Sequence, residues 1–221
     1  MMDLAPRIDS TNLRPDATAL DIISLCEEAR VSRFAAVCIN PYRLSLAAPI
    51  LQDTGVKIAT VIAFPLGADT AKMKYLASRT ALEGGAGELD MVMNIGAIKD
   101  KEYNVLQDEI ESVLQLKQDY DFVLKIIVET ALLDPVELAV VTQIISAEEA
   151  DYIKTSTGFS SRGVSIEDIS LINQHKSDKL KIKASGGIKD VAFALRLLSQ
   201  GVHRIGTSNA GDILRAYNAT S

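Results

Sequence analysis

The sequence predicts an α/β fold, a barrel of eight parallel strands and eight helical connections that takes up residues 1–221 as one domain. Short apolar runs rich in β-branched residues recur eight times, about every 28 residues, which is the length that one strand, one helix and two short loops need. Segments with helical spacing of apolar residues lie between these runs. No Pro- or Ser-rich linker divides the chain.

The eight apolar runs are the predicted strands. They cover residues 7–11, 34–40, 57–64, 88–94, 122–129, 152–157, 181–185 and 204–208. Their unbroken apolar character is typical of parallel strands that are buried on both faces. Eight regular units favour closure into a (βα)8 TIM barrel over an open doubly wound sheet.

The predicted helices lie between the strands. They cover residues 17–30, 70–83, 102–117, 135–145, 166–174 and 191–198. Asp134 and Ser165 are typical residues at the start of a helix, and Gly84 and Gly201 are typical residues just after its end.

The composition excludes several classes of function. With 23 Lys and Arg against 29 Asp and Glu, the net charge is −6, which argues against nucleic acid as the main partner. No apolar run approaches the ~18 residues of a membrane span, and the first residues lack the basic-then-apolar layout of a signal peptide. We therefore expect a cytoplasmic protein that acts on small molecules, without a nucleic-acid or membrane partner.

Metal and cofactor motifs are missing from the sequence. Cys26 and Cys38 make no disulfide framework, and His175 and His203 have no Cys or His at ligand spacing. No Walker A loop or Gly-x-Gly-x-x-Gly dinucleotide loop occurs. We expect no metal and no cofactor.

Five ionisable residues interrupt five of the predicted strands: Asp9, Asp90, Lys125, Lys154 and Lys183. Each alone fits either a structural ion pair or the outer face of a strand. Burying such charges costs several kcal/mol each unless they are paired. Five of them in five strands therefore indicate a functional site inside the barrel.

Lys154 and Lys183 are 29 residues apart, one strand–helix unit, so they should lie on neighbouring strands. Small residues follow both, which marks the carboxyl ends of the strands, where barrel enzymes carry their sites. Two ammonium groups held close together repel, so the pKa of at least one of these lysines should fall. A neutral lysine attacks carbonyl carbon to form a Schiff base, and Asp90 is placed to move protons.

Glycine and other small residues lie at the carboxyl ends of the last two predicted strands. Gly186-Gly187 comes after the seventh run, and Gly206-Thr207-Ser208-Asn209 ends the eighth run and continues past it. Loops at these two places, with a helix N-terminus, form the recurrent phosphate site of this barrel. Gly-Gly alone is as typical of a tight turn, but the matching positions favour a phosphate site.

The chain resembles the deoxyribose-phosphate aldolase family, a set of class I, Schiff-base-forming aldolases. The most specific part is a Lys-Thr-Ser-Thr-Gly block (residues 154–158) with a Lys-Ala-Ser-Gly-Gly block (residues 183–187) one unit later. The likeness also covers residues 8–13, 37–41, 64–67, 88–92, 125–130 and 204–208, and so runs essentially end to end.

The resemblance implies reversible retro-aldol cleavage of 2-deoxy-D-ribose 5-phosphate to D-glyceraldehyde 3-phosphate and acetaldehyde, without a metal. Lys154 corresponds to the Schiff-base lysine, Lys183 to the second lysine of the proton relay and Asp90 to the proton-transferring carboxylate. The implied phosphate-binding residues are Gly158, Gly186, Gly187, Gly206 and Ser208. The implied substrate-pocket residues are Asp9, Thr11, Cys38 and Lys125. The family also implies a dimer or higher homo-oligomer.

Three positions depart from the pattern common in this family. Ser10 stands where many members have His, Ala63 where many have Gly, and Lys189 where many have Arg. A lysine contacts phosphate as a point charge, whereas arginine offers a planar fork. None of the three departures touches Lys154, Lys183 or Asp90.

Two other functions fit the same residues. One is another phosphate-binding TIM-barrel enzyme, an isomerase or a different Schiff-base synthase, which a panel of aldehyde donors and acceptors would separate. The other is a non-catalytic sugar-phosphate sensor, which the intact set of Lys154, Lys183 and Asp90 disfavours and a turnover assay would test.

Overall fold

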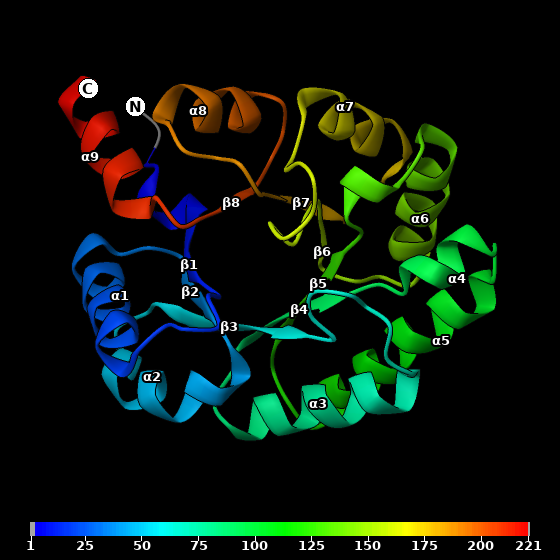
Figure 1. Ribbon diagram of the computed structural model, residues 1–221, viewed down its shortest axis with the longest axis horizontal. Helices are drawn as coiled ribbons and strands as arrows, with labels where there is room; N and C mark the ends of the chain where they lie inside the picture. The colour runs from blue at the N-terminus through cyan, green and yellow to red at the C-terminus, as the bar shows by residue number, and fades with distance from the viewer. Residues whose placement is uncertain (1–2, 221) are drawn as a thin grey trace.

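Eight parallel strands close into a barrel, and the helices surround it, in the computed structural model, which describes residues 3–220 (Figure 1). Neighbouring strands follow sequence order, and β1 pairs with β8 to close the barrel. The predicted TIM barrel is therefore confirmed. The strands are β1 (Ile8–Asn12), β2 (Ala36–Ile39), β3 (Lys57–Ile62), β4 (Glu88–Val92), β5 (Val123–Ile127), β6 (Tyr152–Lys154), β7 (Lys181–Ser185) and β8 (Arg204–Thr207).

Each predicted run overlaps one of these strands; β1 extends to Asn12, one residue past its run, whereas several other strands are shorter than predicted. β6 ends at Lys154, although its run continues to residue 157. The backbone N–H of Thr155 still donates to the carbonyl of Lys183 at 3.1 Å, after which the chain leaves the sheet. Apolar or small residues at a strand's carboxyl end thus belong to the loop that forms the barrel's mouth.

Nine α-helices lie within the described residues: α1 (Ala19–Ser32), α2 (Leu44–Leu51), α3 (Ala71–Glu83), α4 (Ile95–Lys99), α5 (Tyr103–Leu114), α6 (Pro135–Ala147), α7 (Ile166–His175), α8 (Val191–Ser199) and α9 (Ala210–Thr220). The six predicted helices are all present. The sequence did not predict α2, α4 and α9. α2 contains Pro49 and α4 is only five residues long, so neither has the pattern of a free-standing helix.

The predicted helix starts at Asp134 and Ser165 are capping boxes. Each side chain accepts a hydrogen bond from the backbone three residues later, and the acidic residue there, Glu137 or Asp168, accepts one in return. Gly201 follows α8 with φ +86°, a left-handed conformation that glycine adopts without steric cost.

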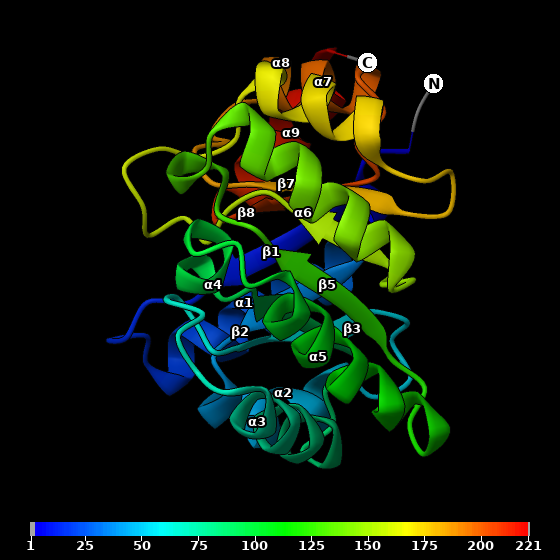
Figure 2. The same ribbon diagram turned by 90° about the vertical axis from the view of Figure 1, so that its right-hand side faces the viewer.

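The barrel interior is divided into an apolar and a charged part. The outward faces of the strands and the inner faces of the helices form the main hydrophobic core, which lies between the sheet and the helical layer (Figure 2). Inside the barrel, a small apolar cluster from the β1–β3 side consists of Leu13, Ala36, Cys38, Ala59 and Val61. The inward positions of β4–β8 are largely polar and carry the ionisable residues.

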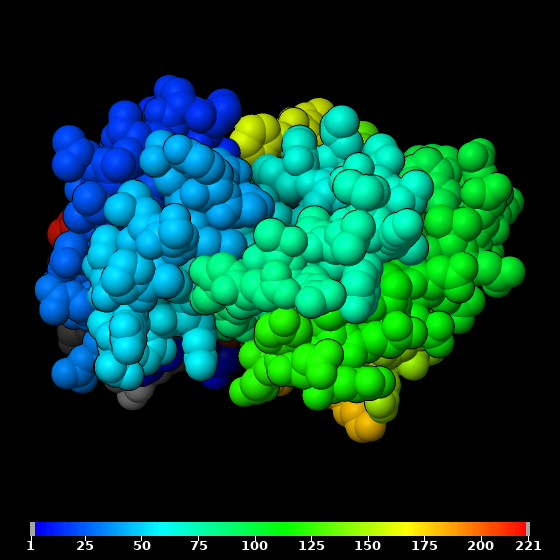
Figure 3. All heavy atoms as spheres, turned by 90° about the horizontal axis from the view of Figure 1, so that it is seen from below, coloured from blue at the N-terminus to red at the C-terminus, as the bar shows by residue number. Residues whose placement is uncertain are grey.

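A buried ion pair outside the barrel fastens the end of β4 to α3 and α5. Lys74 Nζ on α3 lies 2.5 Å from Glu109 Oε2 on α5 and donates to the carbonyl of Val92 at 2.8 Å. Glu109 Oε1 accepts from the backbone N–H of Asn94 at 2.9 Å. Burial lowers the pKa of Lys74 and raises that of Glu109, which makes each charge dependent on the other. Figure 3 shows the outer surface on this side of the molecule, where residues of the first half of the chain cover the barrel.

Replacement of Glu109 by Ala should lower the free energy of unfolding by about 3–5 kcal/mol, because the Lys74 ammonium is then buried without a partner. The double variant Lys74→Met/Glu109→Leu, which removes both charges, should recover most of that loss. Urea unfolding of the two variants and the parent measures this. A loss below about 1 kcal/mol for Glu109→Ala would contradict the role given to the pair.

Candidate active site

The register of the barrel strands brings the charged residues together at one level. Lys125 on β5 lies beside Asp90 on β4, and Lys183 on β7 lies beside both Lys154 on β6 and Arg204 on β8. Successive residues of a strand point to opposite faces, so these paired positions all point inward. The prediction that Lys154 and Lys183 occupy neighbouring strands is confirmed.

Asp90 is the common partner of three lysines. Its Oδ1 accepts from Lys125 Nζ at 2.8 Å, and its Oδ2 accepts from both Lys154 Nζ and Lys183 Nζ at 2.7 Å. Cys38 Sγ lies 3.8 Å from the same Oδ2. One carboxylate thus holds three ammonium groups side by side in the interior of the barrel.

Two further carboxylates and an arginine complete the network below Asp90. Lys183 Nζ lies 2.5 Å from Asp9 Oδ2, and Arg204 Nη1 lies 3.2 Å from Asp9 Oδ1. Arg204 Nη2 donates to Glu88 Oε1 at 2.7 Å, and Glu88 Oε2 lies 2.5 Å from Lys125 Nζ. The contacts close into a ring of six alternating charges, which we call the ionic ring: Arg204, Glu88, Lys125, Asp90, Lys183 and Asp9. Lys154 is attached to this ring only through Asp90.

The ring keeps Asp90 and Lys183 charged. Burial by itself raises the pKa of Asp90, but Lys125, Lys154 and Lys183 outweigh it and hold this pKa well below its usual range. Burial lowers the pKa of Lys183, but Asp9 and Asp90 outweigh it and raise the pKa above its ordinary value. The prediction that the pKa of at least one of Lys154 and Lys183 falls is therefore not met at Lys183. The sequence indicated repulsion and burial, but not that both Asp9 and Asp90 face Lys183.

A cavity of 470 Å³ opens above the ring at the carboxyl ends of the strands. Of Lys125, Lys154 and Lys183, only Lys154 lines it. The structure places seven of the twelve predicted site residues on its wall: Thr11, Lys154, Gly158, Gly186, Gly187, Gly206 and Ser208. The other five are buried beneath it: Asp9, Cys38, Asp90, Lys125 and Lys183.

The glycines at the mouth serve the site in two ways. Gly186 and Gly187 have φ of +83° and +75°, and this left-handed turn after β7 brings backbone to the cavity just before α8 begins at Val191. Gly206 makes room for a lysine, because a Cβ there would lie 3.0 Å from Lys183 Cε. Lys189, the residue that departs from the common Arg, also lines the cavity.

The other two departures lie away from the cavity wall. Ser10 is buried on β1, between the inward positions of Asp9 and Thr11, and so points outward from the barrel. Ala63 follows β3 with φ +53°, in the left-handed region that favours glycine. This backbone conformation is the physical reason why glycine fits the position.

Sequence reasoning missed four contributors to the site. Glu88 and Arg204 are the first residues of β4 and β8, and their places at strand starts hid that they are inward-facing charges. Glu129 follows β5 and is buried. Its Oε2 accepts from the hydroxyl of Thr157 and from its backbone N–H at 3.1 Å, which fixes the loop that follows Lys154.

The fourth is Gly163. A Cβ on this residue would overlap the carbonyl group of Gly186, so glycine alone lets the loop after β6 pass over the turn after β7. The inward period of two in β4 and β8 was a signal that could have found Glu88 and Arg204. The contacts of Glu129 and Gly163 join separate loops and leave no such signal.

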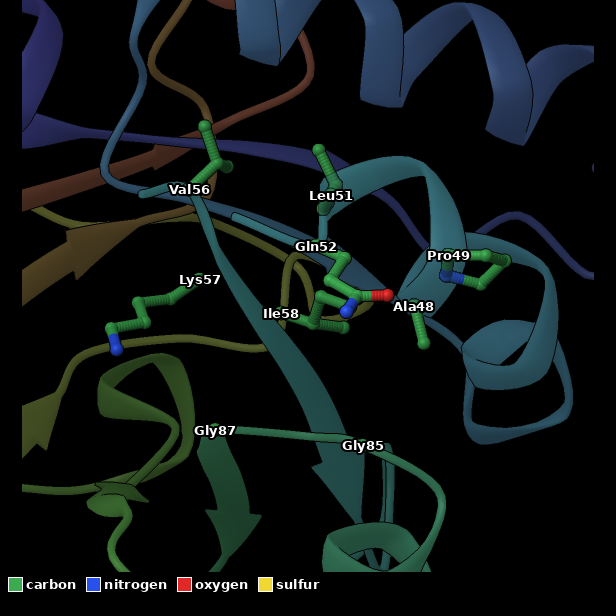
Figure 4. A pocket seen from close by; sticks show the side chains of 9 residues that line it. All are labelled: Ala48, Pro49, Leu51, Gln52, Val56, Lys57, Ile58, Gly85 and Gly87. Atoms are coloured by element: carbon green, nitrogen blue, oxygen red, sulfur yellow. The ribbon is translucent and has the colours of Figure 1, made fainter. Parts of the chain in front are cut away.

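A second cavity lies at the opposite end of the barrel (Figure 4). It has a volume of 480 Å³ and lies between α2 and the starts of β3 and β4. Its wall is made of Ala48, Pro49, Leu51, Gln52, Val56, Lys57, Ile58, Gly85 and Gly87. Lys57 is the single ionisable side chain in this wall, so the cavity offers no group of residues for chemistry.

Across residues 3–220, no three or more His, Cys, Asp and Glu side chains come together in a way that could hold a metal ion. Within the same residues, no helix is both long and apolar enough to cross a membrane. Burial raises the pKa of both thiols, Cys26 and Cys38, to about 11, with Asp90 adding to the effect at Cys38. The thiol beside Asp90 is therefore protonated at neutral pH.

Comparisons with known proteins give one consistent result. A family model described as DeoC/LacD family aldolase matches residues 5–211. The chain is 44% identical over 221 residues to the deoxyribose-phosphate aldolase of Thermococcus gammatolerans, covering 99% of this chain and 98% of the relative. It is 45% identical over 212 residues to that of Dictyoglomus turgidum, covering 96% of each.

Solved structures agree. A putative deoxyribose-phosphate aldolase from Coccidioides immitis superimposes with a TM-score of 0.93 at 36% identity, covering 98% of this chain and 86% of the other. The tetrameric deoxyribose phosphate aldolase of Aeropyrum pernix superimposes with a TM-score of 0.90 at 31% identity, covering 99% and 92%.

The depressed pKa values of Asp9 and Asp90 predict a loss of stability in acid. Unfolding raises each pKa to about 3.9, so the unfolded chain takes up more protons below that pH. The contribution of these two carboxylates to the free energy of unfolding should be nearly constant from pH 7 to 5. Below pH 4 it should fall with a slope of up to about 3 kcal/mol per pH unit.

Urea unfolding at a series of pH values measures this slope. The raised pKa of Lys183 does not contribute to it, because that stabilisation is fully present below the unfolded pKa of about 10.4 and is lost only in strong alkali. A constant free energy of unfolding down to pH 3 would contradict the ionic ring.

Proposed function

The chain belongs to the DeoC/LacD family of aldolases, and from this membership we propose that it is a deoxyribose-phosphate aldolase acting through a Schiff base on Lys154. As a class I aldolase it is a carbon–carbon lyase. The reaction is the reversible cleavage of 2-deoxy-D-ribose 5-phosphate to D-glyceraldehyde 3-phosphate and acetaldehyde.

One observation carries the choice of Lys154. It lines the cavity and has a single carboxylate partner, whose Oδ2 it shares with Lys183. Lys183 has a second carboxylate, Asp9, and Lys125 has a second one, Glu88. Among the three lysines, Lys154 therefore has the fewest carboxylate partners and the only access to a substrate carbonyl.

In the proposed mechanism the neutral amine of Lys154 attacks C1 of the open-chain sugar phosphate, and loss of water gives a protonated imine. A general base then removes the proton of the C3 hydroxyl. The C2–C3 bond breaks, and its electron pair moves towards the imine nitrogen to give an enamine. Glyceraldehyde 3-phosphate leaves. The remaining enamine is protonated at C2, and hydrolysis of the imine releases acetaldehyde and restores the amine.

Asp90 and Lys183 are the proposed proton carriers. Because three ammonium groups hold the pKa of Asp90 far down, Asp90 is a weak base in the free protein. We therefore infer a relay, in which Asp90 passes protons between the ammonium of Lys183 and the bound intermediate, directly or through water. Asp9 and Lys125 keep both ends of this relay charged.

The glycine loops form the proposed phosphate site. Gly158, Gly186, Gly187, Gly206 and Ser208 share the cavity with Lys154. Backbone N–H groups and a nearby helix N-terminus suit an anion, and binding the phosphate there fixes the position of C1 over the amine. Thr11 on the cavity wall and Cys38 beneath it border the space for the sugar.

We also propose that the chain forms a homo-oligomer. The relative from Aeropyrum pernix is a tetramer. Leu66, Met73 and Leu76 follow β3 closely in sequence and are 74%, 52% and 42% exposed, which is apolar surface suited to contact between copies.

Borohydride added with 2-deoxyribose 5-phosphate should trap a covalent adduct on Lys154, because the imine is reduced to a stable secondary amine. Peptide mass spectrometry locates the adduct. Lys154→Ala should lose the adduct and at least about 1,000-fold in kcat, and EDTA should leave the rate of the parent unchanged. Activity retained by Lys154→Ala, with no adduct in the parent, would sink the proposed function.

Lys189→Arg should lower KM for the phosphorylated substrate by about two- to fivefold at unchanged kcat, because a guanidinium holds phosphate with two parallel hydrogen bonds. Lys189→Ala should raise KM by about tenfold. Unphosphorylated 2-deoxyribose is the control substrate, and its KM should respond to neither change. Equal effects on both sugars would assign Lys189 a role other than phosphate contact.

A further inference from the structure

We propose that Glu88 and Arg204, which do not reach the cavity, are positioning residues that set the pH range in which Lys154 becomes reactive. This inference rests on the proposed function, but its test includes a chemical labelling of Lys154 that can be measured without catalysis. The two side chains are joined at 2.7 Å and occupy the first positions of β4 and β8.

Neither residue is available to a substrate. Glu88 and Arg204 are 3% and 9% exposed and are not part of the cavity wall. Their partners lie above them, since Glu88 contacts Lys125 and Arg204 contacts Asp9. Any effect they have on the reaction must therefore pass through those two partners.

The contacts in the ring determine the direction in which the loss of each residue changes the charge around Lys154. Glu88 supplies the second carboxylate of Lys125; without it, Lys125 depends on Asp90 alone and competes more strongly with Lys154 for that carboxylate. Arg204 is the second cation of Asp9; without it, Asp9 acts on Lys183 alone and the negative charge near Lys154 rises.

The interior carries four cations and three carboxylates: Lys125, Lys154, Lys183 and Arg204 against Asp9, Glu88 and Asp90. This balance leaves one positive charge in excess, and Lys154 is the member with one partner and an open side. Loss of a proton from Lys154 makes the set neutral. Removing Glu88 should favour that loss and removing Arg204 should oppose it.

The other ionisable groups around Lys154 are identified by the barrel. Cys38 faces it from β2, where the raised pKa keeps the thiol neutral, and Tyr152 precedes it on β6 with a pKa that burial raises. Arg14 and Lys189 line the cavity above it. The thiol of Cys38 and the phenol of Tyr152 stay uncharged between pH 6 and 9. All of these groups are the same in every variant, so a difference between variants comes from the ring.

The test measures how fast trace acetic anhydride acetylates Lys154 between pH 5 and 10, by peptide mass spectrometry on the folded full-length protein. The pH of half-maximal labelling should fall by about half to one unit in Glu88→Gln and rise by a similar amount in Arg204→Gln. The acid limb of the pH profile of kcat/KM should shift in the same direction as the labelling midpoint in each variant. The substrate phosphate titrates identically in every variant, so it does not cause a difference between them.

Two matched variants separate electrostatic from structural effects. Arg204→Lys keeps the charge, and Glu88→Gln/Arg204→Gln removes one charge of each sign, so both should label like the parent. Glu109→Gln removes a buried, ion-paired carboxylate outside the barrel and should lower stability while leaving the midpoint in place. If a single variant does not fold, the double variant still tests the inference. Its pH of half-maximal labelling must stay within about 0.3 unit of that of the parent.

Unchanged midpoints in Glu88→Gln and Arg204→Gln, or shifts of the same sign in both, would overturn the inference. So would a displaced midpoint in the double variant. Failure of the proposed function has a different signature: the parent would neither cleave 2-deoxyribose 5-phosphate nor yield a borohydride adduct, while the labelling midpoints still shift in opposite directions.

Discussion

The site depends on the carboxylate of Asp90, which holds three ammonium groups at 2.7–2.8 Å inside the barrel. Each of these charges alone would cost several kcal/mol to bury. Together with Asp9, Glu88 and Arg204 they form a nearly balanced set, so the cost of burial is offset by contacts that only a closed barrel can provide. Removal of Asp90 would leave Lys154 without its carboxylate partner.

The same arrangement makes the lysines unequal. Lys125 and Lys183 each contact two carboxylates, whereas Lys154 contacts one and faces the cavity. In the proposed mechanism this difference separates the nucleophile from the lysines that stay protonated. Chemically identical lysines thus take different roles because they contact different numbers of carboxylates. Active sites commonly use such differences in environment to give like side chains different roles.

The rest of the fold keeps this geometry in place. On β2 and β3 the interior positions are apolar, so the polar network has one apolar wall to lie against. The Lys74–Glu109 pair fastens the end of β4 two residues beyond Asp90, and Glu129 fastens the loop beyond Lys154. Gly206 leaves space for the stem of Lys183. These contacts come from outside the site and fix where its charges lie.

The sequence by itself determined the barrel, because eight apolar runs at regular spacing leave little choice of topology, and it marked the charges that interrupt those runs. It also placed Lys154 beside Lys183, since one strand–helix unit separates neighbouring strands. Only the tertiary structure decided which carboxylates face which lysines. That depends on the register around the closed barrel, which brings Asp9 on β1 to Lys183 on β7 and Glu88 on β4 to Arg204 on β8.

For this reason the sequence did not show that the pKa of Lys183 rises, and Glu88 and Arg204 were overlooked. α2 and α9 were missed for a related reason. α2 packs against α1 and β3, and α9 packs against β1, and such tertiary packing supplies most of the stability of a helix in a protein. The local sequence pattern shows the periodicity of apolar residues in a helix or strand. The pKa of a buried group and the stability of a short helix depend instead on neighbours that are distant in the chain.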